Sequence, residues 1–247
     1  MDLVSIIIPY YKKKNFISFA INSALKQSYK NIEIIIIYDD ENLDDLRIIE
    51  EIKKTDERIK IIKNKKTIGA GLSRNIGISL SQGTYIAFLD ADDIWKTDKL
   101  TKQINFMKNN NLDISHTTYS IIDENKNYIS KRIARNFFKL DDLLKSCDIG
   151  TSTVVLKRYL FDDGLLFPAL KTKEDFVLWL NILKKNIKIY SLNEDLSMWR
   201  QSKYSLSSST TQKLIDGFKV YYKYMNFNYF KSLYYLLCLS LNYLIKK

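Results

Sequence analysis

The amino-acid sequence predicts an α/β protein with a mostly parallel, Rossmann-like sheet flanked by helices. Short apolar runs alternate with amphipathic helical segments over the first hundred residues, which is the pattern of right-handed βαβ units. The apolar runs are continuous, as expected for strands that helices cover on both faces. The chain has 247 residues, 46% hydrophobic and 27% charged, which is the composition of a folded globular protein.

The first elements follow one another in a regular order. In mostly parallel α/β sheets, ligands bind at the carboxyl ends of the strands. Polar residues just beyond a strand are therefore the candidates for the functional site. Asn15 is the expected cap of the first helix. The expected strands are 3–10, 32–38, 58–64 and 84–89, and the expected helices are 15–28, 43–54 and 69–82.

Beyond residue 96 the pattern is less regular. Thr97 is the expected cap of the next helix, and residues 125–127 form the turn of an expected hairpin. The expected elements are a helix at 97–110, the hairpin at 112–134, a short helix at 140–147, a strand running into a helix at 152–161, an amphipathic helix at 174–186, and short strands at 187–192 and 195–200.

The charge balance is strongly basic. Lys and Arg number 39 against 28 Asp and Glu, a formal net charge of +11, which predicts a polyanionic partner or an anionic surface. Nucleic acid and the cytoplasmic face of a membrane are both candidates. The first residues lack the pattern of a signal peptide, and no apolar run reaches the roughly 20 residues that span a bilayer.

Histidine and cysteine counts exclude several chemistries. The single histidine, His116, excludes multi-histidine zinc sites. It alternates with Ile114 and Thr118 on an expected strand, which favours a structural role. Cys147 and Cys238 match no metal-ligand spacing, so we expect a reduced, cytosolic setting.

Three carboxylates follow the fourth expected strand. These are Asp90, Asp92 and Asp93, with Trp95 close behind. Crowded carboxylates repel one another unless positive charge neutralises them. Asp90 and Asp92 point the same way in an extended segment, and such a pair suits Mg²⁺ or Mn²⁺ completed by substrate phosphates. The alternative is a solvated turn.

Candidate residues also occur at a second strand end and at two helix starts. Asp39 and Asp40 can accept hydrogen bonds from a base or ribose, or one of them caps the following helix. Arg74 lies in a glycine-containing run whose spacing does not match a dinucleotide fingerprint, and its guanidinium suits a diphosphate. Glu174 and Asp175 open a helix whose dipole keeps a carboxylate ionised. Such a carboxylate can act as a general base, or it is an ordinary acidic first turn.

Taken in order, these motifs resemble the family 2 glycosyltransferases. The motifs are Pro-x-Tyr at 9–11, the acidic pair, Ser-Arg-Asn at 73–75, Leu-Asp-Ala-Asp-Asp-x-Trp at 89–95 and Glu-Asp-x-x-Leu-Trp-Leu at 174–180. The resemblance covers residues 3 to about 203. It implies a GT-A fold and an inverting transfer of sugar from a nucleotide diphosphate. It also implies a nucleotide-binding half (1–96), an acceptor and catalytic half (97–203) and, beyond the match, a helical amphipathic extension (204–247).

The resemblance implies a role for each site residue. Asp92 would ligate Mn²⁺ or Mg²⁺, Asp90 would contact the ribose or a water near the metal, and Asp175 would deprotonate the acceptor hydroxyl. The other assigned residues are Pro9, Tyr11 and Asp40 for the nucleoside, Arg74 for the diphosphate, Arg200 for the diphosphate or the acceptor, and Glu174 and Trp95 for the acceptor.

The chain departs from the family pattern at two places. Glu41 and Asn42 replace the usual Gly-Ser after the acidic pair, so the turn there is altered. A histidine that often follows the position of Arg200 is absent, and Gln201, Ser202 and Lys203 stand in that region.

The donor, the acceptor and two rival functions stay open at this level. Asp40 at the base pocket favours a UDP-sugar, with galactose, glucose or their N-acetyl forms as the sugar, and dTDP-rhamnose or another nucleotide is the alternative. The resemblance alone implies a bacterial surface glycan as acceptor, lipid-linked or on lipopolysaccharide. A sugar nucleotidylyltransferase is one rival, although the run after the first strand has lysines and no glycine. A basic nucleic-acid-binding protein is the other, although the lysines are dispersed and no RNA-binding motif is present.

The last 31 residues combine an apolar stripe with lysines. The uncharged stretch 232–245 is too short to span a bilayer. We therefore expect a helix that lies on an anionic leaflet at the inner face of the membrane. Packing on its own domain, or pairing of two subunits, is the alternative. The stripe comprises Phe230, Leu233, Leu237 and Leu241 with Leu236 and Leu244, and the lysines are Lys219, Lys223, Lys231, Lys246 and Lys247.

Overall fold

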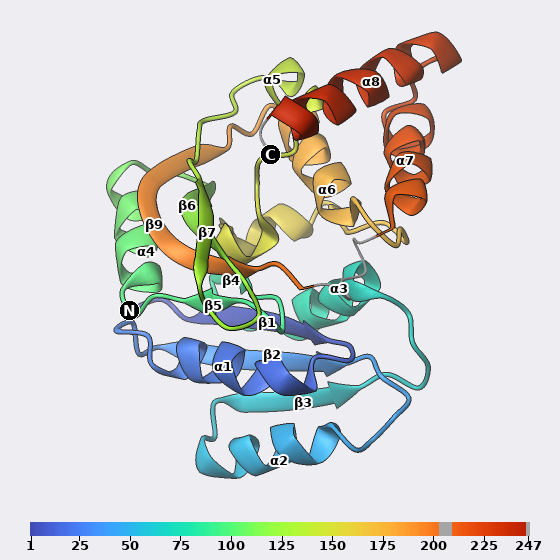
Figure 1. Cartoon of the computed structure of the whole chain (residues 1–247). Helices are drawn as coiled ribbons and strands as arrows, with labels where there is room; N and C mark the ends of the chain where they lie inside the picture. The colour runs from blue at the N-terminus through green and yellow to red at the C-terminus, as the bar shows by residue number, and fades with distance from the viewer. Residues whose placement is uncertain (203–208, 246–247) are drawn as a thin grey trace.

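The computed structural model describes residues 1–202 and 209–245 (Figure 1). In this part of the chain nine strands form one sheet with the order β3-β2-β1-β4-β8-β6-β9-β5, and β7 pairs with β6. Helices cover both faces of the sheet. The predicted α/β class is confirmed.

The first half of the sheet is parallel, as predicted. β1 pairs with β2 and β4, and β2 pairs with β3, all in parallel register. β1 and β2 are fully buried runs rich in β-branched residues, which suits a strand covered on both faces. The bounds are β1 Val4–Tyr10, β2 Ile32–Tyr38, β3 Ile59–Lys63 and β4 Tyr85–Phe88, with helices α1 Lys14–Leu25, α2 Leu46–Thr55 and α3 Ala70–Leu80.

The second half of the sheet is mixed. β8 (Val155–Lys157) runs antiparallel to β4 and β6, while β9 (Tyr190–Arg200) runs parallel to β6 and antiparallel to β5. β9 is one strand where the sequence predicted two, because its register with β6 (Ile114–Ile122) shifts opposite Thr117–Tyr119 and interrupts the pattern. β5 (Ile94–Trp95) was not predicted. The predicted hairpin is confirmed, with β7 spanning Tyr128–Arg132.

Two predicted helix caps are wrong. α1 begins at Lys14, before Asn15, and α4 (Lys99–Asn109) begins two residues after Thr97. The carbonyl of Thr97 accepts a hydrogen bond from the backbone N–H of Ser28, so this part of the chain is held against the end of α1 and the helix starts later. The other elements are α5 Leu140–Leu144, the 3₁₀ turns η1 Thr151–Thr153 and η2 Arg158–Phe161, and α6 Glu174–Lys184.

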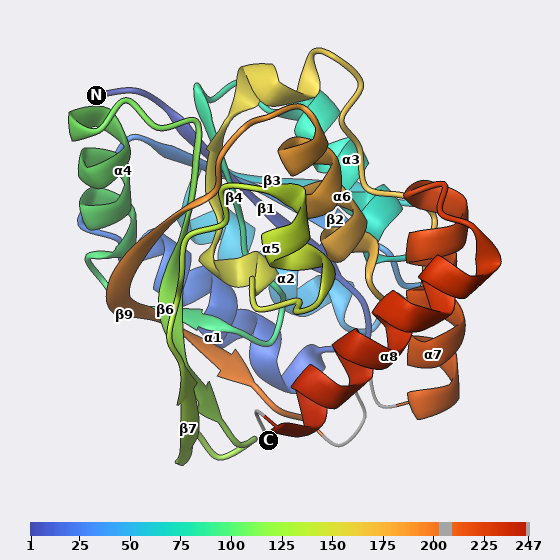
Figure 2. The same cartoon turned by 90° about the horizontal axis from the view of Figure 1, so that it is seen from above.

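The C-terminal helices pack on the same core as α6. They are α7 (Thr210–Lys219), the π-helical turn η4 (Val220–Tyr224) and α8 (Tyr229–Ile245), and Figure 2 shows α7 and α8 beside α6. Tyr235 and Leu239 of α8 join the core cluster that contains α6. The predicted boundary at 203–204 lies outside the described residues, so the division into parts stays a prediction. None of the described helices has the length and apolarity needed to cross a membrane.

Two core clusters lie on opposite faces of the sheet. One contains side chains of α1, α2 and α4, and the other contains side chains of α3, α5, α6 and α8. Helix α3 lies so close to β1 that a Cβ at Gly77 would come within 2.5 Å of Ile7 Cγ2. Gly77 therefore fixes how near α3 can approach the sheet.

We predict that Gly77→Ala destabilises the protein. Overpacking against the buried, β-branched Ile7 lowers the free energy of unfolding by up to ~3 kcal/mol. The higher helix propensity of alanine returns ~1 kcal/mol, so the net loss of stability is about 2 kcal/mol. Urea unfolding followed by circular dichroism measures the loss. Ser79→Ala, at an exposed position of the same helix, is the matched control and is expected to be neutral or slightly stabilising. Equal stability of Gly77→Ala and wild type would contradict the close packing.

Candidate active site

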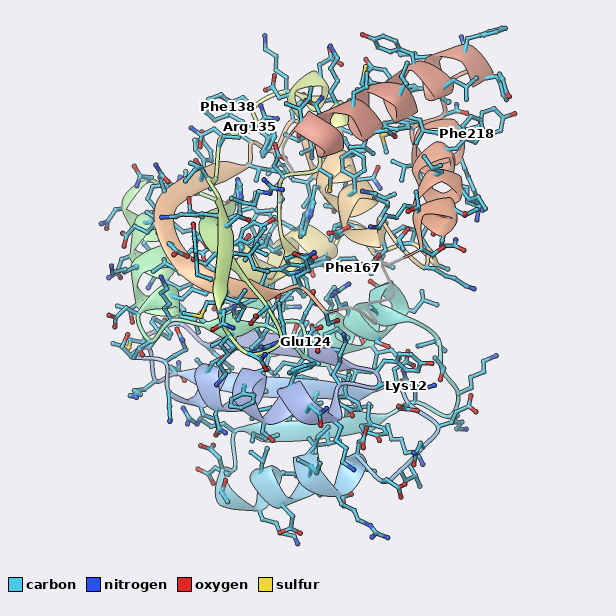
Figure 3. The ribbon with its side chains drawn as sticks, viewed as in Figure 1. Lys12, Glu124, Arg135, Phe138, Phe167 and Phe218 are labelled. Atoms are coloured by element: carbon cyan, nitrogen blue, oxygen red, sulfur yellow. The ribbon has the colours of Figure 1, made fainter. Side chains whose placement is uncertain are left out.

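The carboxyl ends of the parallel strands bring the predicted residues to one edge of the sheet. Tyr11 and Lys12 follow β1, Asp39 and Asp40 follow β2, and the loop 89–93 follows β4. Figure 3 shows Lys12 at this edge. The candidate residues after these strands thus lie at one end of the sheet, as expected for parallel strands.

Each carboxylate of the aspartate loop, residues 90–93, has its own partner. These partners come from α3, from the start of α1, from η1 and from the end of β9, so four separate segments converge on the loop. The protein itself therefore offsets much of the negative charge. The contacts are Asp90 Oδ1 with Arg74 Nη2 (2.6 Å), Asp92 Oδ2 with Lys13 Nζ (2.7 Å), and Asp93, which accepts from Ser152 Oγ (2.5 Å) and the Arg200 backbone N–H (2.9 Å).

Burial raises the pKa of two carboxylates in the aspartate loop. Loss of hydration raises the pKa of Asp92, with Lys13 opposing this rise and Asp90 adding to it. The pKa of Asp93 is raised well above its usual range by burial and by the charges of Asp92 and Asp90. Added positive charge would therefore stabilise the ionised loop.

The donor set of the loop fits a hard divalent cation. No group of three or more metal-ligating His, Cys, Asp or Glu side chains occurs among the residues that the structure describes. Mg²⁺ and Mn²⁺ do not need such a group, because they are commonly bound by one or two carboxylates together with waters and substrate phosphates. Asp92, with Asp90 two residues away, provides oxygen ligands of this kind.

Arg74 joins the aspartate loop to helix α6. Its guanidinium is buried between Asp90 and Glu174, with 2.8 Å between Nη1 and Glu174 Oε1. It also lies over the ring of Phe167 at 5.3 Å, and Figure 3 shows this ring near α3 and α6. The structure thus shows Arg74 as a bridge, and its predicted contact with a diphosphate stays a prediction.

The two carboxylates at the start of α6 differ in their surroundings. Glu174 is paired with Arg74, and burial raises its pKa to about 7, with Arg74 opposing and Asp175 reinforcing the rise. Asp175 Oδ2 accepts a hydrogen bond from the neutral Thr151 hydroxyl at 3.0 Å. Among the described residues, Glu174 therefore forms an ion pair, whereas Asp175 forms none.

The turn η1 is a part of the site that the sequence did not reveal. Ser152 Oγ donates to Asp93 and accepts from the Asp90 backbone N–H at 3.0 Å, while Thr151 next to it donates to Asp175. Helix α6 is therefore tied to the aspartate loop twice, through Arg74 and through η1. The Thr-Ser-Thr run just before an apolar strand was the available signal.

The two acidic residues after β2 have different environments. Asp39 accepts hydrogen bonds from the backbone of Ile68 and Gly69 and so fixes the loop before α3. Asp40 accepts from the backbone N–H of Asn42 at 3.1 Å, which shapes the altered turn. Neither caps α2. Pro9 is buried and Tyr11 is half-buried at the end of β1, and the roles of Pro9, Tyr11 and Asp40 stay predictions.

Arg200 connects the loop to the β6–β7 turn. Its Nε donates to the Asp92 carbonyl, and its Nη1 donates to the carbonyls of Asp123 and Glu124. Arg200 Nη2 is buried and has no hydrogen-bond partner among the described residues. Its assignment to the diphosphate or the acceptor stays a prediction.

Trp95 and His116 lie in the interior. Trp95 is 3% exposed, and its indole N–H donates to the Ser152 carbonyl at 2.7 Å. The assignment of Trp95 to the acceptor stays a prediction that this burial does not favour. His116 Nε2 is hydrogen-bonded to the Arg135 carbonyl, and burial lowers its pKa to about 4, which suits the predicted structural role.

Comparison with known proteins identifies the family. The model described as "Glycosyl transferase family 2" matches residues 5–163. The chain is 40% identical over 213 residues to WfgD of Escherichia coli, named UDP-Glc:alpha-D-GlcNAc-diphosphoundecaprenol beta-1,3-glucosyltransferase, covering 86% of this chain and 82% of that protein. It is 35% identical over 232 residues to TuaG of Bacillus subtilis (strain 168), a glycosyltransferase named for teichuronic acid biosynthesis, covering 93% and 91%.

Solved structures confirm the predicted GT-A fold. TarS of S. aureus in complex with UDP-GlcNAc matches with a TM-score of 0.74 at 19% identity, covering 89% of this chain and 64% of that chain. The mannosyltransferase PcManGT from Pyrobaculum calidifontis, in complex with GDP-Man and Mn²⁺, matches with a TM-score of 0.69 at 12% identity, covering 91% and 64%. The chain thus spans less than two thirds of these two longer chains. Together, the family model and the relatives that align along most of their length show that this chain belongs to glycosyltransferase family 2 and is a glycosyltransferase, not either of the rival functions.

Proposed function

We propose that the protein transfers a sugar from a UDP-sugar to a hydroxyl of a lipid-linked saccharide in bacterial surface-glycan synthesis. The observation that carries this proposal is the double connection between the aspartate loop and the start of α6, through Arg74 and through η1. It holds a base candidate in fixed relation to the carboxylates of a donor site. The printed name of WfgD, with UDP-Glc and a diphosphoundecaprenol acceptor, supports the donor and acceptor classes.

The donor half of the site is assigned to the carboxyl edge of β1, β2 and β4. Asp40 is assigned to the base, and Asp90 is assigned to the ribose or to a water near the metal. A cation held by Asp92, Mn²⁺ or Mg²⁺, would supply a Lewis acid for the diphosphate leaving group. The other residues assigned to the donor are Pro9 and Tyr11 for the nucleoside and Arg74 and Arg200 for the diphosphate.

Asp175 is the proposed general base. It takes the proton of the acceptor hydroxyl while that oxygen attacks the anomeric carbon, and the bond from this carbon to the diphosphate oxygen breaks. One displacement inverts the anomeric centre, and the nucleoside diphosphate leaves with the bonding electron pair. The transition state has oxocarbenium character. Glu174, which is held by Arg74, is assigned to acceptor binding.

We predict that UDP with Mn²⁺ stabilises the protein and that Asp92→Ala removes the Mn²⁺-dependent part. At about 100 times its Kd, a ligand adds ~2.7 kcal/mol, a shift of about 5–10 °C for a chain of this size. Thermal unfolding with UDP, GDP, dTDP and CMP, each with and without Mn²⁺, measures the shift. Stabilisation by GDP alone would sink the UDP assignment, and an unchanged Mn²⁺ effect in Asp92→Ala would sink the metal assignment.

We predict that Asp175→Asn lowers kcat by about 10²–10⁴-fold, the usual contribution of a general base, and leaves UDP binding nearly unchanged. Sugar transfer to a synthetic lipid-linked saccharide and the UDP thermal shift separate the two effects. Glu174→Gln is the comparison, because it alters the neighbouring carboxylate and its pairing with Arg74. Near-normal turnover of Asp175→Asn would make Glu174 the better base candidate.

We also propose that the exposed stripe of α8 contacts an anionic membrane, so that the enzyme acts in the cytoplasm at the inner face. Most of the stripe predicted from the sequence faces outward, with Phe230 82% and Leu237 59% exposed, whereas Leu236 packs against the core. Lysines of α7, η4 and α8 lie close to it in sequence, and each basic residue near an anionic leaflet adds about 1 kcal/mol. The side chain of Leu244 and residues Lys246, Lys247 and Lys203 lie outside the described part of the chain.

We predict that wild type floats with vesicles containing phosphatidylglycerol and that Leu237→Glu floats markedly less. A buried charge in the apolar contact opposes insertion. Leu80→Glu, which alters an exposed leucine on α3, is the matched control and floats like wild type. Recovery of wild type in the soluble fraction with every vesicle would favour a protein partner, and light scattering would then test for a homodimer.

A further inference from the structure

Lys13 makes an ion pair with the proposed metal ligand. Its Nζ lies 2.7 Å from Asp92 Oδ2, and it also donates to Ser202 Oγ at 3.2 Å. Both charged side chains are largely shielded from water, with 18% and 15% exposed. Such shielding strengthens the attraction relative to a surface pair. Lys13 is not among the site residues predicted from the sequence.

The three consecutive lysines after β1 have different surroundings. Lys12 Nζ lies over the Tyr11 ring at 5.1 Å, and Lys14, with 58% of its side chain exposed, is 3.8 Å from Asp45. The Lys13 carbonyl accepts the first hydrogen bonds of α1, so its backbone position is fixed by the helix. Lys13 is therefore the member of this run that the fold aims at the aspartate loop.

An ammonium and a divalent cation cannot both occupy the same side of Asp92 without strong repulsion. A Mg²⁺–oxygen bond is about 2.1 Å long, shorter than the contact that Lys13 already makes. Two cations on one carboxylate oxygen would lie within a few ångströms of each other. Metal binding to Asp92 Oδ2 therefore requires Lys13 to move.

We propose that Lys13 is an internal counter-ion of Asp92 that competes with the divalent cation and so makes metal binding depend on the nucleotide. This inference rests on the proposed metal-dependent function. Without nucleotide, the cation must displace Lys13 and leave its ammonium without an anion. With a nucleoside diphosphate present, the displaced ammonium gains phosphate oxygens as partners. Metal and nucleotide then strengthen each other's binding, and this coupling is reciprocal.

The test measures the affinity of Mn²⁺ for the full chain, with and without UDP, from the electron paramagnetic resonance signal of free Mn²⁺. In Lys13→Met, Mn²⁺ alone should bind about tenfold tighter, the effect of losing one charge-assisted contact that competes for Asp92. The factor by which UDP strengthens Mn²⁺ binding should fall by a similar amount. Lys13→Arg should keep the coupling of wild type. Lys14→Met, the matched control on the same run, should behave as wild type.

A second variant separates charge from hydrogen bonding and guards against misfolding. Lys13→Gln keeps a donor for Ser202 but removes the charge, so it should behave like Lys13→Met. Thermal unfolding in chelator should show both neutral variants less stable than wild type, and added Mn²⁺ should narrow the difference, because it replaces the missing positive charge.

Two results would overturn the inference, and they are distinguishable. Equal affinity of wild type and Lys13→Met for Mn²⁺ alone would show that Lys13 does not compete. Wild type that binds no Mn²⁺ even with UDP would refute the metal-dependent function itself, and with it any competition at Asp92. The first result leaves the proposed function standing, and the second does not.

Discussion

The buried guanidinium of Arg74 is the interaction on which the geometry of the site depends. A buried cation is costly unless it is paired and hydrogen-bonded, and here it has Asp90 at 2.6 Å and Glu174 at 2.8 Å. Losing either carboxylate would leave one nitrogen of the buried guanidinium without its hydrogen-bond partner. Arg74 therefore obliges the aspartate loop and the start of α6 to stay together, although they belong to different halves of the chain.

This pairing is possible only because α3 approaches its neighbours closely. A Cβ at Gly71 would lie 3.0 Å from Glu174 Cγ, and one at Gly77 would collide with Ile7. In this run, whose glycine spacing does not match a dinucleotide fingerprint, Gly71 and Gly77 thus serve helix packing. They allow one helix to press on the sheet and on α6 at once, with Arg74 between them.

The sequence predicted the half of the molecule whose signals are local. Continuous apolar runs and helical periodicity mark the parallel strands, and the rule that parallel strands end at one edge brings Asp40 and Asp92 to the same side. In the mixed half, the sequence predicted the β6–β7 hairpin, whose turn is local, but it missed β5 and the unbroken β9, which depend on pairing between distant segments. The contacts of Ser152 with Asp93 and of Lys13 with Asp92 join residues far apart in the chain, so they became visible only in three dimensions.

Helix α8 shows most directly what helical periodicity cannot predict, namely which face packs on the protein. The stripe through Phe230 and Leu237 has the spacing of a core-facing helix, yet the structure packs the opposite face, with Tyr235 and Leu239 buried. A helix that is apolar all round gives no signal of which side meets the protein. The packed face joins α8 to the core of α6, and α6 also carries Asp175 at its start. The outward stripe is therefore joined through the core to the helix that carries the proposed base, so whatever this surface meets is held in a set orientation to Asp175.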